Sequence, residues 1–195
     1  MGQVSNQPTE DEWRRILEPF DGWNRRALLG IFALFGIPPT LLDIGSGTGA
    51  MVQFARSFGI QAVGVDQIAQ KPPDVRTDLA TPLDLGKQFA YVLCLETAEH
   101  IPEMYVETFV GNIARHVADG GLFIFSAASP GQAGNGHVNL RGADYWRTMF
   151  HGRQLLYRED MTIKLKLAWQ LIPMPMMWLA ANCQVFSKPT QENPA

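Results

Sequence analysis

The sequence predicts an α/β protein in which a doubly wound, Rossmann-like sheet, mostly parallel, is covered by helices. Between residues 40 and 126, short apolar runs typical of buried strands alternate with segments of helical periodicity. A glycine-rich turn, residues 45–49, follows the first of these runs and opens a helix. With 195 residues, 46% of them hydrophobic, the chain has enough apolar material for the core of a single domain, expected over residues 9–188.

Two helices are expected at the start of this domain, after a tail of residues 1–8. Thr9 is a suitable N-cap for the first helix, because acidic residues that favour a helix N-terminus follow it directly. The second helix is expected over residues 21–35 and ends before a glycine and two prolines. Together, residues 9–36 are expected to form a helical lid over a site.

Residues 40–126 are expected to form a cofactor-binding core. Apolar runs and glycine breaks predict its strands at 40–44, 62–65, 75–79, 89–95 and 122–126, and its helices at 49–58 and 104–117. Asp119-Gly120-Gly121 is expected to be the turn that closes the second of these helices. The segment 67–75 is short, so the helix before the third strand is expected to be a single turn or missing.

Residues 127–188 are expected to supply ligand-binding loops and helices and the final strand, before a tail at residues 189–195. Residues 162–168 fit both a strand and a helix, because their apolar side chains alternate and also share one helical face; we predict a helix. A glycine-rich loop, a helix and the final strand are predicted at 129–136, 142–150 and 178–187.

The glycine-rich turn is the strongest functional signal in the chain. Gly45, Gly47 and Gly49 let the backbone turn tightly and approach a ligand without a clash from Cβ atoms. The helix that follows offers unpaired N–H groups to a negatively charged group. Asp66 ends the second strand 21 residues after Gly45 (66 − 45), where a carboxylate can accept both hydrogen bonds of a ribose diol. The turn therefore predicts a nucleoside cofactor.

Two kinds of cofactor fit this turn. Gly45, Gly47 and Ala50 have the dinucleotide spacing, so an NAD-linked oxidoreductase is one interpretation. Asp43 argues against it, because dinucleotide sites usually carry an apolar residue two positions before the first glycine. Gly49 extends the glycine run in a way that suits a ligand with a carboxylate and an ammonium group. A chain of this length also leaves little room for a separate substrate domain.

Residues 41–49 resemble the first motif of the class I S-adenosylmethionine (SAM)-dependent methyltransferases, and Gly64-Val65-Asp66 resembles their second. Three further segments resemble family motifs in the family's order: Thr77-Asp78-Leu79, Leu95-Glu96-Thr97-Ala98-Glu99-His100-Ile101-Pro102 and Ala118-Asp119-Gly120-Gly121-Leu122-Phe123-Ile124. The resemblance implies SAM as the cofactor, a methyltransferase activity, and a seven-stranded sheet whose last strand is antiparallel.

The resemblance also implies roles for individual residues. Asp43 and the glycine turn, residues 45–49, would hold the methionine end of SAM, and Asp66 would hold the ribose. Gln67 and two apolar residues, Ile68 and Leu79, would flank the adenine, with Asp78 directed toward its amine. The cofactor-binding residues expected in this way are Asp43, Gly45, Ser46, Gly47, Gly49, Asp66, Gln67, Ile68, Asp78, Leu79 and Leu95.

Candidate catalytic residues follow the fourth and fifth strands, at the sheet edge where α/β proteins bind ligands. Glu99 and His100 lie after the fourth strand, and His137 lies in the loop after the fifth. An imidazole suits proton removal near neutral pH, so His137 is expected to act on a hydroxyl acceptor, whereas a thiolate or free amine needs no base. We expect a small organic acceptor, methylated on oxygen or nitrogen, in contact with Trp13, Trp23, Tyr145 and Trp146.

Charge and composition disfavour several other classes of protein. The net charge is −3 and no basic stripe is present, so nucleic acid is not expected as a partner. The longest apolar stretch, residues 27–39, is too short to span a membrane. Cys94 and Cys183 lie in apolar runs and indicate reduced thiols, so a cytoplasmic location is expected. The histidines and cysteines show no metal-binding spacing, so no metal is expected. A non-catalytic binding protein of this fold is the remaining alternative, and the oligomeric state is left open.

Overall fold

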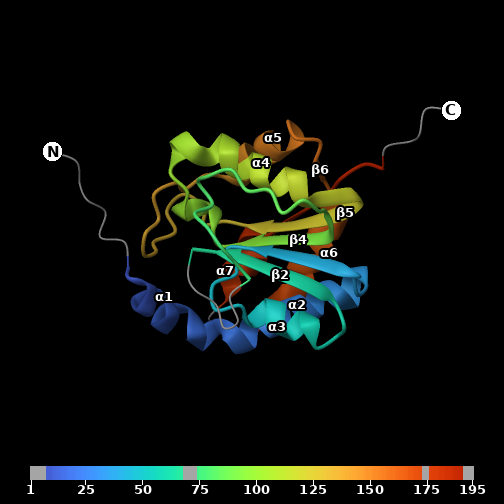
Figure 1. Ribbon diagram of the computed structural model, residues 1–195, viewed down its shortest axis with the longest axis horizontal. Helices are drawn as coiled ribbons and strands as arrows, with labels where there is room; N and C mark the ends of the chain where they lie inside the picture. Colours follow the sequence, from blue (N-terminus) through green and yellow to red (C-terminus); the bar gives the residue numbers. More distant parts are fainter. Residues whose placement is uncertain (1–7, 68–73, 173–175, 191–195) are drawn as a thin grey trace.

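The computed structural model describes residues 8–67, 74–172 and 176–190, and it shows a seven-stranded sheet between two layers of helices (Figure 1). The strand order is β3-β2-β1-β4-β5-β7-β6. The first five strands pair in parallel, whereas β7 runs antiparallel to both β5 and β6. The predicted fold class, with an antiparallel last strand, is confirmed. The strands are β1 (Thr40–Ile44), β2 (Gln61–Asp66), β3 (Val75–Arg76), β4 (Phe89–Leu95), β5 (Val117–Ser126), β6 (Leu156–Tyr157) and β7 (Gln184–Ser187).

The helices cover both faces of this sheet. In Figure 1, α4 and α5 lie above the sheet, and α2 and α3 lie below it. The buried residues of α6 and α7 share one apolar cluster with those of α2 and α3, so these four helices pack on the same face. The helices are α1 (Glu10–Leu17), α2 (Asp21–Phe35), α3 (Ala50–Arg56), α4 (Val106–His116), α5 (Ala143–His151), α6 (Glu159–Gln170) and α7 (Met177–Asn182), with 3₁₀ turns η1 (Glu18–Phe20), η2 (Ala98–His100) and η3 (Glu103–Tyr105).

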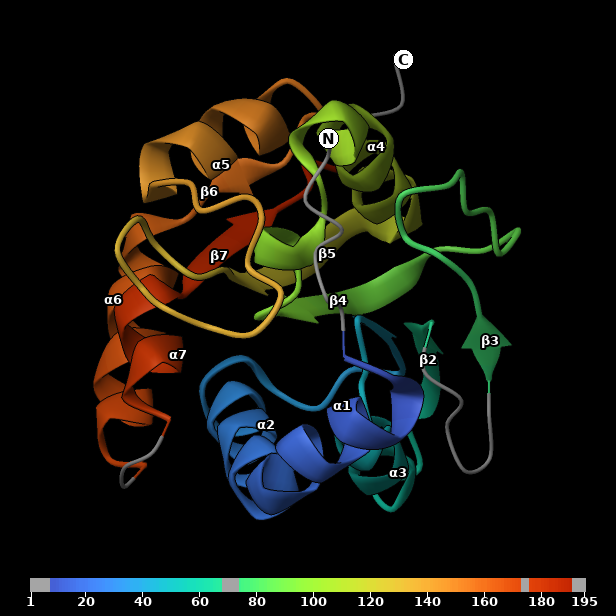
Figure 2. The ribbon, with the colours of Figure 1, turned by 90° about the vertical axis from the view of Figure 1, so that its left-hand side faces the viewer.

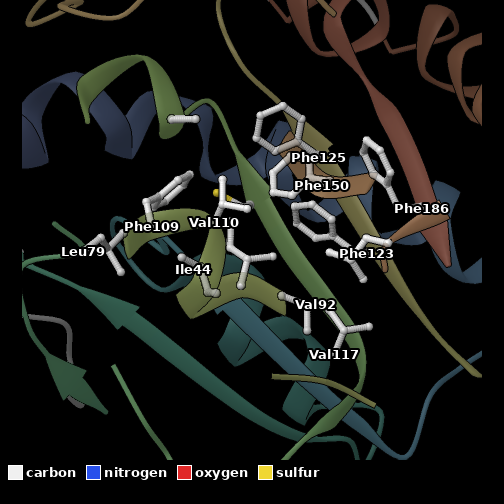
Figure 3. Packing of buried hydrophobic residues seen from close by; sticks show 14 of the residues in the cluster. Ile44, Leu79, Val92, Phe109, Val110, Val117, Phe123, Phe125, Phe150 and Phe186 are labelled. Carbon is white, nitrogen blue, oxygen red and sulfur yellow. The ribbon is translucent and has the colours of Figure 1, made fainter. Parts of the chain in front are cut away.

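Successive strand residues point to opposite sides, so the central strands supply apolar side chains to the helix layers on both faces of the sheet. In β5, Phe123 and Phe125 belong to the cluster under α4 and α5, and Ile124 belongs to the opposite cluster. Phe150 of α5 and Phe186 of β7 join the first two rings (Figure 3), with the Phe123 and Phe150 centroids 4.8 Å apart. Burying one such side chain stabilises the fold by about 1.5–3 kcal/mol, so these rings fix α5 and β7 to the centre of the sheet.

Local contacts explain how the N-terminal helices begin and where they pack. The Thr9 hydroxyl accepts a hydrogen bond from the Glu12 N–H, and the Glu12 carboxylate accepts one from the Thr9 N–H, so the predicted N-cap of α1 is confirmed as a capping box. Further along, the Trp169 indole N–H donates to the Ala27 carbonyl at 3.0 Å. A Cβ at Gly30 would lie 3.3 Å from the same indole, so the glycine lets α6 approach α2 closely.

One predicted turn is part of a strand. Asp119-Gly120-Gly121 was expected to close the helix before it, but α4 ends at His116 and these residues lie within β5. The pairing of β4 with β5 shifts register at this point, and the Gly120 N–H donates to the Lys188 carbonyl at 2.9 Å. Gly120 has a φ of 74°, so the two glycines form an irregularity inside the strand. In the sequence, the same residues look like a turn, because Asp and Gly are typical of turns as well.

The predicted final strand at 178–187 is wrong in its first half. Residues Met177–Asn182 form α7, and only Gln184–Ser187 form β7. A short continuous apolar run fits a buried helix and a buried strand equally well, so periodicity could not separate the two. The sequence also missed β6, which is only Leu156–Tyr157, whereas the preferred helix at 162–168 is confirmed as part of α6.

The remaining predicted elements are found with small changes at their ends. The strand expected at 75–79 is shorter, because β3 ends at Arg76. The predictions for residues 1–7, Ile68, the helix before β3 and residues 191–195 fall outside the described residues. Within the described residues, no helix is both long enough and apolar enough to cross a membrane.

Candidate active site

A cavity of about 1220 Å³ opens at the carboxyl ends of β1, β2 and β4. In Figure 2, α1 and the loop that follows β5 lie across this edge of the sheet. The volume exceeds the range of about 300–1,000 Å³ typical of pockets for one small molecule, so a nucleoside cofactor and an acceptor fit together. Twelve residues singled out in the sequence line it: Trp13, Gly45, Ser46, Gly47, Asp66, Gln67, Asp78, Leu79, Leu95, Glu99, His100 and His137.

The glycine turn forms one end of the cavity and cannot carry side chains at its first two glycines. Gly45 and Gly47 have φ values of 79° and 55°, a conformation that costs other residues conformational energy. A Cβ at Gly45 would lie 2.1 Å from the Thr97 hydroxyl oxygen. The Gly47 N–H donates to Oδ2 of Asp66 at 2.8 Å. The turn is therefore a backbone cradle that lines the cavity beside a carboxylate, which fits the amino acid and ribose ends of SAM.

Two of the predicted cofactor residues support the turn from behind. Asp43 is 4% exposed and is not part of the cavity lining. Burial, and secondarily the negative charge of Asp66, raise the pKa of Asp43 to about 7. Gly49 is buried with a φ of 77° and is the N-cap residue of α3. Both residues shape the backbone that the cofactor would contact.

The predicted adenine-binding residues lie beside the turn, with one outside the described residues. Gln67, Asp78 and Leu79 line the cavity, and Ile68 is the residue that the structure does not describe. Leu79 is 6% exposed and also belongs to the apolar cluster under α4. The Asp78 carboxylate accepts a hydrogen bond from the Ala80 N–H at 2.8 Å, which holds this loop at the cavity edge.

The three candidate catalytic residues meet in the same cavity. Nε2 of His137 lies 3.9 Å from Oε1 of Glu99, and the centroids of the His100 and His137 rings are 5.2 Å apart. The Glu99 carbonyl accepts backbone hydrogen bonds from Val138 and Asn139, at 2.9 and 3.0 Å. These two bonds carry the loop after β5 back onto η2, and they place an imidazole from one segment beside a carboxylate from the other.

Backbone carbonyls orient both imidazoles. Nδ1 of His100 lies 3.1 Å from the Gly136 carbonyl oxygen, and Nδ1 of His137 lies 3.1 Å from the Gln132 carbonyl oxygen. A carbonyl oxygen only accepts, so each Nδ1 carries the proton and each neutral ring keeps an electron pair on Nε2. A Cβ at Gly134 would lie 2.2 Å from the His137 ring, so the loop needs glycine there to pack against it.

Burial dominates the electrostatics of this cluster. Glu99 is 1% exposed, and burial raises its pKa to about 8, with a smaller contribution from the negative charge of Glu96. Burial also raises the pKa of Glu96, although hydrogen bonds from neighbouring side chains act in the opposite direction. Burial lowers the pKa of His100. Glu96 has a φ of 50°, a rare conformation for this residue type, and such conformations cluster at functional sites.

The N-terminal helices contact the walls of the cavity through polar and aromatic side chains. The Thr48 hydroxyl donates to the Asp21 carboxylate at 2.6 Å, which joins the start of α2 to the glycine turn. Arg76 at the end of β3 pairs with Glu10 of α1 at 2.9 Å. The Trp13 ring meets the His100 ring edge to face, with centroids 5.2 Å apart.

The structure places three of the four aromatic residues expected to contact the acceptor outside the cavity lining. Trp146 is 1% exposed and packs between Phe125 and Phe150 in the core under α5. Tyr145 packs against the same cluster, and Trp23 packs against the α2 cluster beneath the side chain of Arg26. Aromatic residues on amphipathic helices fit a core as well as a pocket. Here they pack in the core, where their apolar surface is removed from water. Trp13 alone of the four lines the cavity.

Several lining residues had no signal in the sequence. Tyr105, Gln132 and Met176 reach the cavity from turns and loops, and Trp178 reaches it from α7. Trp178 was assigned to a strand and Tyr105 to a helix, and Gln132 lay in the predicted glycine-rich loop without being singled out. Their place depends on long-range packing, such as the hydrogen bond of Ser129 to Asn182 that joins the loop after β5 to α7.

Comparisons with known proteins agree with this geometry. A family model described as a methyltransferase domain matches residues 15–162, which is more than half of the chain. Two curated relatives are ubiquinone biosynthesis O-methyltransferases, from Paramagnetospirillum magneticum and from a Bradyrhizobium species. Each is 30% identical over 44% of this chain, and the match spans 39% and 38% of their respective lengths. The chain therefore matches about two fifths of these relatives.

Solved structures share the fold at low sequence identity. The sugar N-methyltransferase KedS8 of a Streptoalloteichus species has a TM-score of 0.64 at 15% identity, covering 97% of this chain and 96% of that one. The 1,6-didemethyltoxoflavin-N1-methyltransferase of Burkholderia thailandensis has a TM-score of 0.64 at 16% identity, covering 90% and 82%. From the family match, the strand order and the cradle beside Asp66, we conclude that the chain belongs to the methyltransferase domain family, as a class I SAM-dependent methyltransferase.

Proposed function

We propose that this protein methylates an oxygen atom of a small organic acceptor with SAM as the methyl donor. The observation that carries the proposal is the joint lining of one cavity by the glycine turn with Asp66 and by the polar cluster of Glu99, His100 and His137. The first group suits the cofactor, and the second suits an acceptor that must lose a proton. An amine acceptor needs no such group, which is why oxygen is favoured over nitrogen.

The chain's own residues fit SAM at named points. The Gly45–Gly47 backbone lines the cavity, and the Gly47 N–H fixes the Asp66 carboxylate at the cavity edge. That carboxylate would accept hydrogen bonds from the ribose hydroxyls. Bound SAM supplies a methyl group on a sulfonium, which an acceptor's electron pair displaces to leave S-adenosylhomocysteine while the acceptor's proton is released.

The lid would exclude water and position the acceptor. Trp13, Leu17 and Phe20 line the cavity from the N-terminal helices, and Trp178 and Leu179 line it from α7. These apolar side chains suit the ring or hydrocarbon part of an acceptor. Holding two reactants in this way contributes about 7–11 kcal/mol to lowering a bimolecular barrier, so alignment supplies a large part of the catalysis.

The test compares cofactors and acceptors side by side. Calorimetric titration should give saturable binding of SAM and no binding of NAD, because the glycine turn, supported from behind by the buried Asp43, suits an amino acid end and not a pyrophosphate. Transfer of a labelled methyl group should then be measured to matched pairs of small phenols and anilines. Transfer to phenols alone supports the proposal. NAD binding, transfer to anilines alone, or SAM binding with no transfer to either set would overturn it in favour of an oxidoreductase, an N-methyltransferase or a non-catalytic protein.

A further inference from the structure

We propose that Glu99, His100 and His137 bind one divalent transition-metal ion at the acceptor end of the cavity. Each residue offers one ligand atom, and the three atoms all lie within 4.8 Å of one another. Glu99 and His100 come from η2 after β4, and His137 comes from the loop after β5. The inference rests on the proposed function for its chemical purpose, but the metal site itself is defined by these three side chains alone.

The hydrogen bonds of both histidines prepare them as ligands. In metal sites, an imidazole that binds the ion usually donates its other ring N–H to a carboxylate or a backbone carbonyl. His100 and His137 both do so through Nδ1, to the carbonyls of Gly136 and Gln132 at 3.1 Å. Each ring is thereby held in the tautomer whose Nε2 electron pair is available to a cation.

One oxygen of the buried Glu99 carboxyl group lacks a hydrogen-bond partner in the part of the chain that the structure describes. Its side chain is 1% exposed, and within the described residues its Oε2 atom has no hydrogen-bond partner. Ionising a carboxyl group in a buried position carries a desolvation cost, and coordination of a metal ion by the carboxylate compensates that cost. A cation between Glu99 and the two imidazoles would supply that compensation.

The ligand set selects the class of ion. Mg²⁺ and Ca²⁺ prefer all-oxygen ligands, whereas two imidazoles and one carboxylate suit Zn²⁺, Mn²⁺, Co²⁺ or Fe²⁺. Bonds of about 2.1 Å place tetrahedral ligands about 3.4 Å apart, compared with 3.9 Å between His137 Nε2 and Glu99 Oε1. Because no two of the three ligand atoms are more than 4.8 Å apart, a contraction of at most about 1.4 Å would close the site, through shifts of the side chains and the glycine-rich loop.

The site leaves coordination positions open toward the cavity. Three protein ligands with an open fourth position are the arrangement found in catalytic metal sites, and structural sites are closed. Because all three residues line the cavity, an oxygen of the acceptor can occupy the open position. The class of acceptor that fits best carries two neighbouring oxygens, as in a catechol or a vicinal diol, because it can hold the ion with one oxygen or both.

The first test is metal binding by the intact protein after removal of metals with a chelator. Calorimetry with Zn²⁺, Mn²⁺ and Mg²⁺ should give one site per chain, with Zn²⁺ bound at least 100-fold more tightly than Mg²⁺. Co²⁺ should give visible absorption bands of a site with mixed nitrogen and oxygen ligands. Absence of stoichiometric binding by Zn²⁺, Mn²⁺ and Co²⁺ alike, or equal affinity for Zn²⁺ and Mg²⁺, would overturn the site without any variant.

Variants then locate the ion. His137→Gln, His100→Gln and Glu99→Gln should each weaken Zn²⁺ binding at least 100-fold, whereas His151→Gln, an exposed histidine on α5, should leave it unchanged. SAM affinity should be unchanged in all four, which shows that they are folded and separates this inference from the proposed function. Retained Zn²⁺ affinity in the His137 variant, or an equal loss in the His151 variant, would place the ion elsewhere and refute the assignment.

Discussion

The backbone N–H of Gly47 donates a hydrogen bond of 2.8 Å to Oδ2 of Asp66, which ties the turn after β1 to the end of β2. The two residues are 19 positions apart in the chain, and parallel pairing of β1 with β2 brings them together. The carboxylate is therefore oriented by the same backbone that would hold the cofactor's amino acid end. Changes at either residue should act on cofactor binding before they act on the fold.

Asp66→Ala should weaken SAM binding by about 1.5–3 kcal/mol, the range for a hydrogen bond to a charged group. That corresponds to a loss of about 10- to 150-fold in affinity, measured by calorimetry. Asp144→Ala is the control, because the Asp144 side chain is 94% exposed on α5 and distant in sequence from the cofactor motifs. Unchanged SAM affinity in a folded Asp66 variant would show that the ribose lies elsewhere.

Gly45→Ala should destabilise the protein, and Gly22→Ala should not. At Gly45 the new Cβ would lie 2.1 Å from Thr97 Oγ1 on a backbone with a φ of 79°, so both the space and the conformation oppose it. At Gly22, in the first turn of α2, a Cβ meets no atom within 4 Å. We expect a loss of about 1–3 kcal/mol in unfolding free energy for Gly45→Ala, and a gain of up to about 1 kcal/mol for Gly22→Ala. The free energies of unfolding of the two variants can be measured from urea unfolding curves, and equal values would contradict the steric argument.

Stability should fall between about pH 4 and pH 7 partly because of Asp43. Burial raises the pKa of this group to about 7 in the folded protein, from 3.8 when unperturbed. Across this interval the folded protein keeps a proton that the unfolded chain has released, so stability is fully present below the unfolded pKa and declines as the pH rises to the folded pKa. One such group contributes a slope of at most about 1.4 kcal/mol per pH unit.

Asp43→Asn should remove this contribution. The difference in unfolding free energy between the variant and the wild type should therefore move in the variant's favour as the pH is raised from 4 to 7. Measuring both proteins in the same buffers cancels the contributions of other groups. A difference that stays constant across this range would mean that Asp43 is ionised in the folded protein.

His137→Gln should lower kcat by about 10²- to 10⁴-fold while leaving SAM affinity unchanged, whether His137 removes a proton or binds the ion. A chelator separates the two roles. If His137 is a ligand, the chelated wild type should fall to the rate of the variant, and added Zn²⁺ or Mn²⁺ should restore only the wild type. If His137 acts as the base expected from the sequence, with no ion involved, the wild-type rate should be indifferent to the chelator.

The cofactor side of the cavity could be predicted from the sequence because its residues lie in local motifs. The glycine turn, Asp66 and Asp78 each stand at or just after a strand end, and a parallel sheet brings such ends to one edge. The signals that predict the helices and strands nearby are also local, because they consist of helix caps, glycines and short apolar runs. Most of the fold around the cofactor therefore follows from short-range patterns.

The acceptor side could not be predicted in the same way. Glu99 and His137 are 38 positions apart (137 − 99), and they meet through backbone bonds from Val138 and Asn139 that no side-chain pattern encodes. For this reason the spacing of histidines gave no sign of a metal site. Trp146 was assigned to the acceptor pocket, because a large aromatic residue after a glycine-rich loop fits a pocket wall and a core equally well.

Helix α1 contributes no fully buried side chain, although it covers the cavity. Its attachment depends on surface contacts such as the Glu10–Arg76 pair, and exposed ion pairs of this kind contribute only about 0–1 kcal/mol each. The helix can therefore detach while the sheet stays folded. In hydrogen–deuterium exchange its amides should lose protection through local opening, orders of magnitude faster than those of β4 and β5, which exchange only on global unfolding.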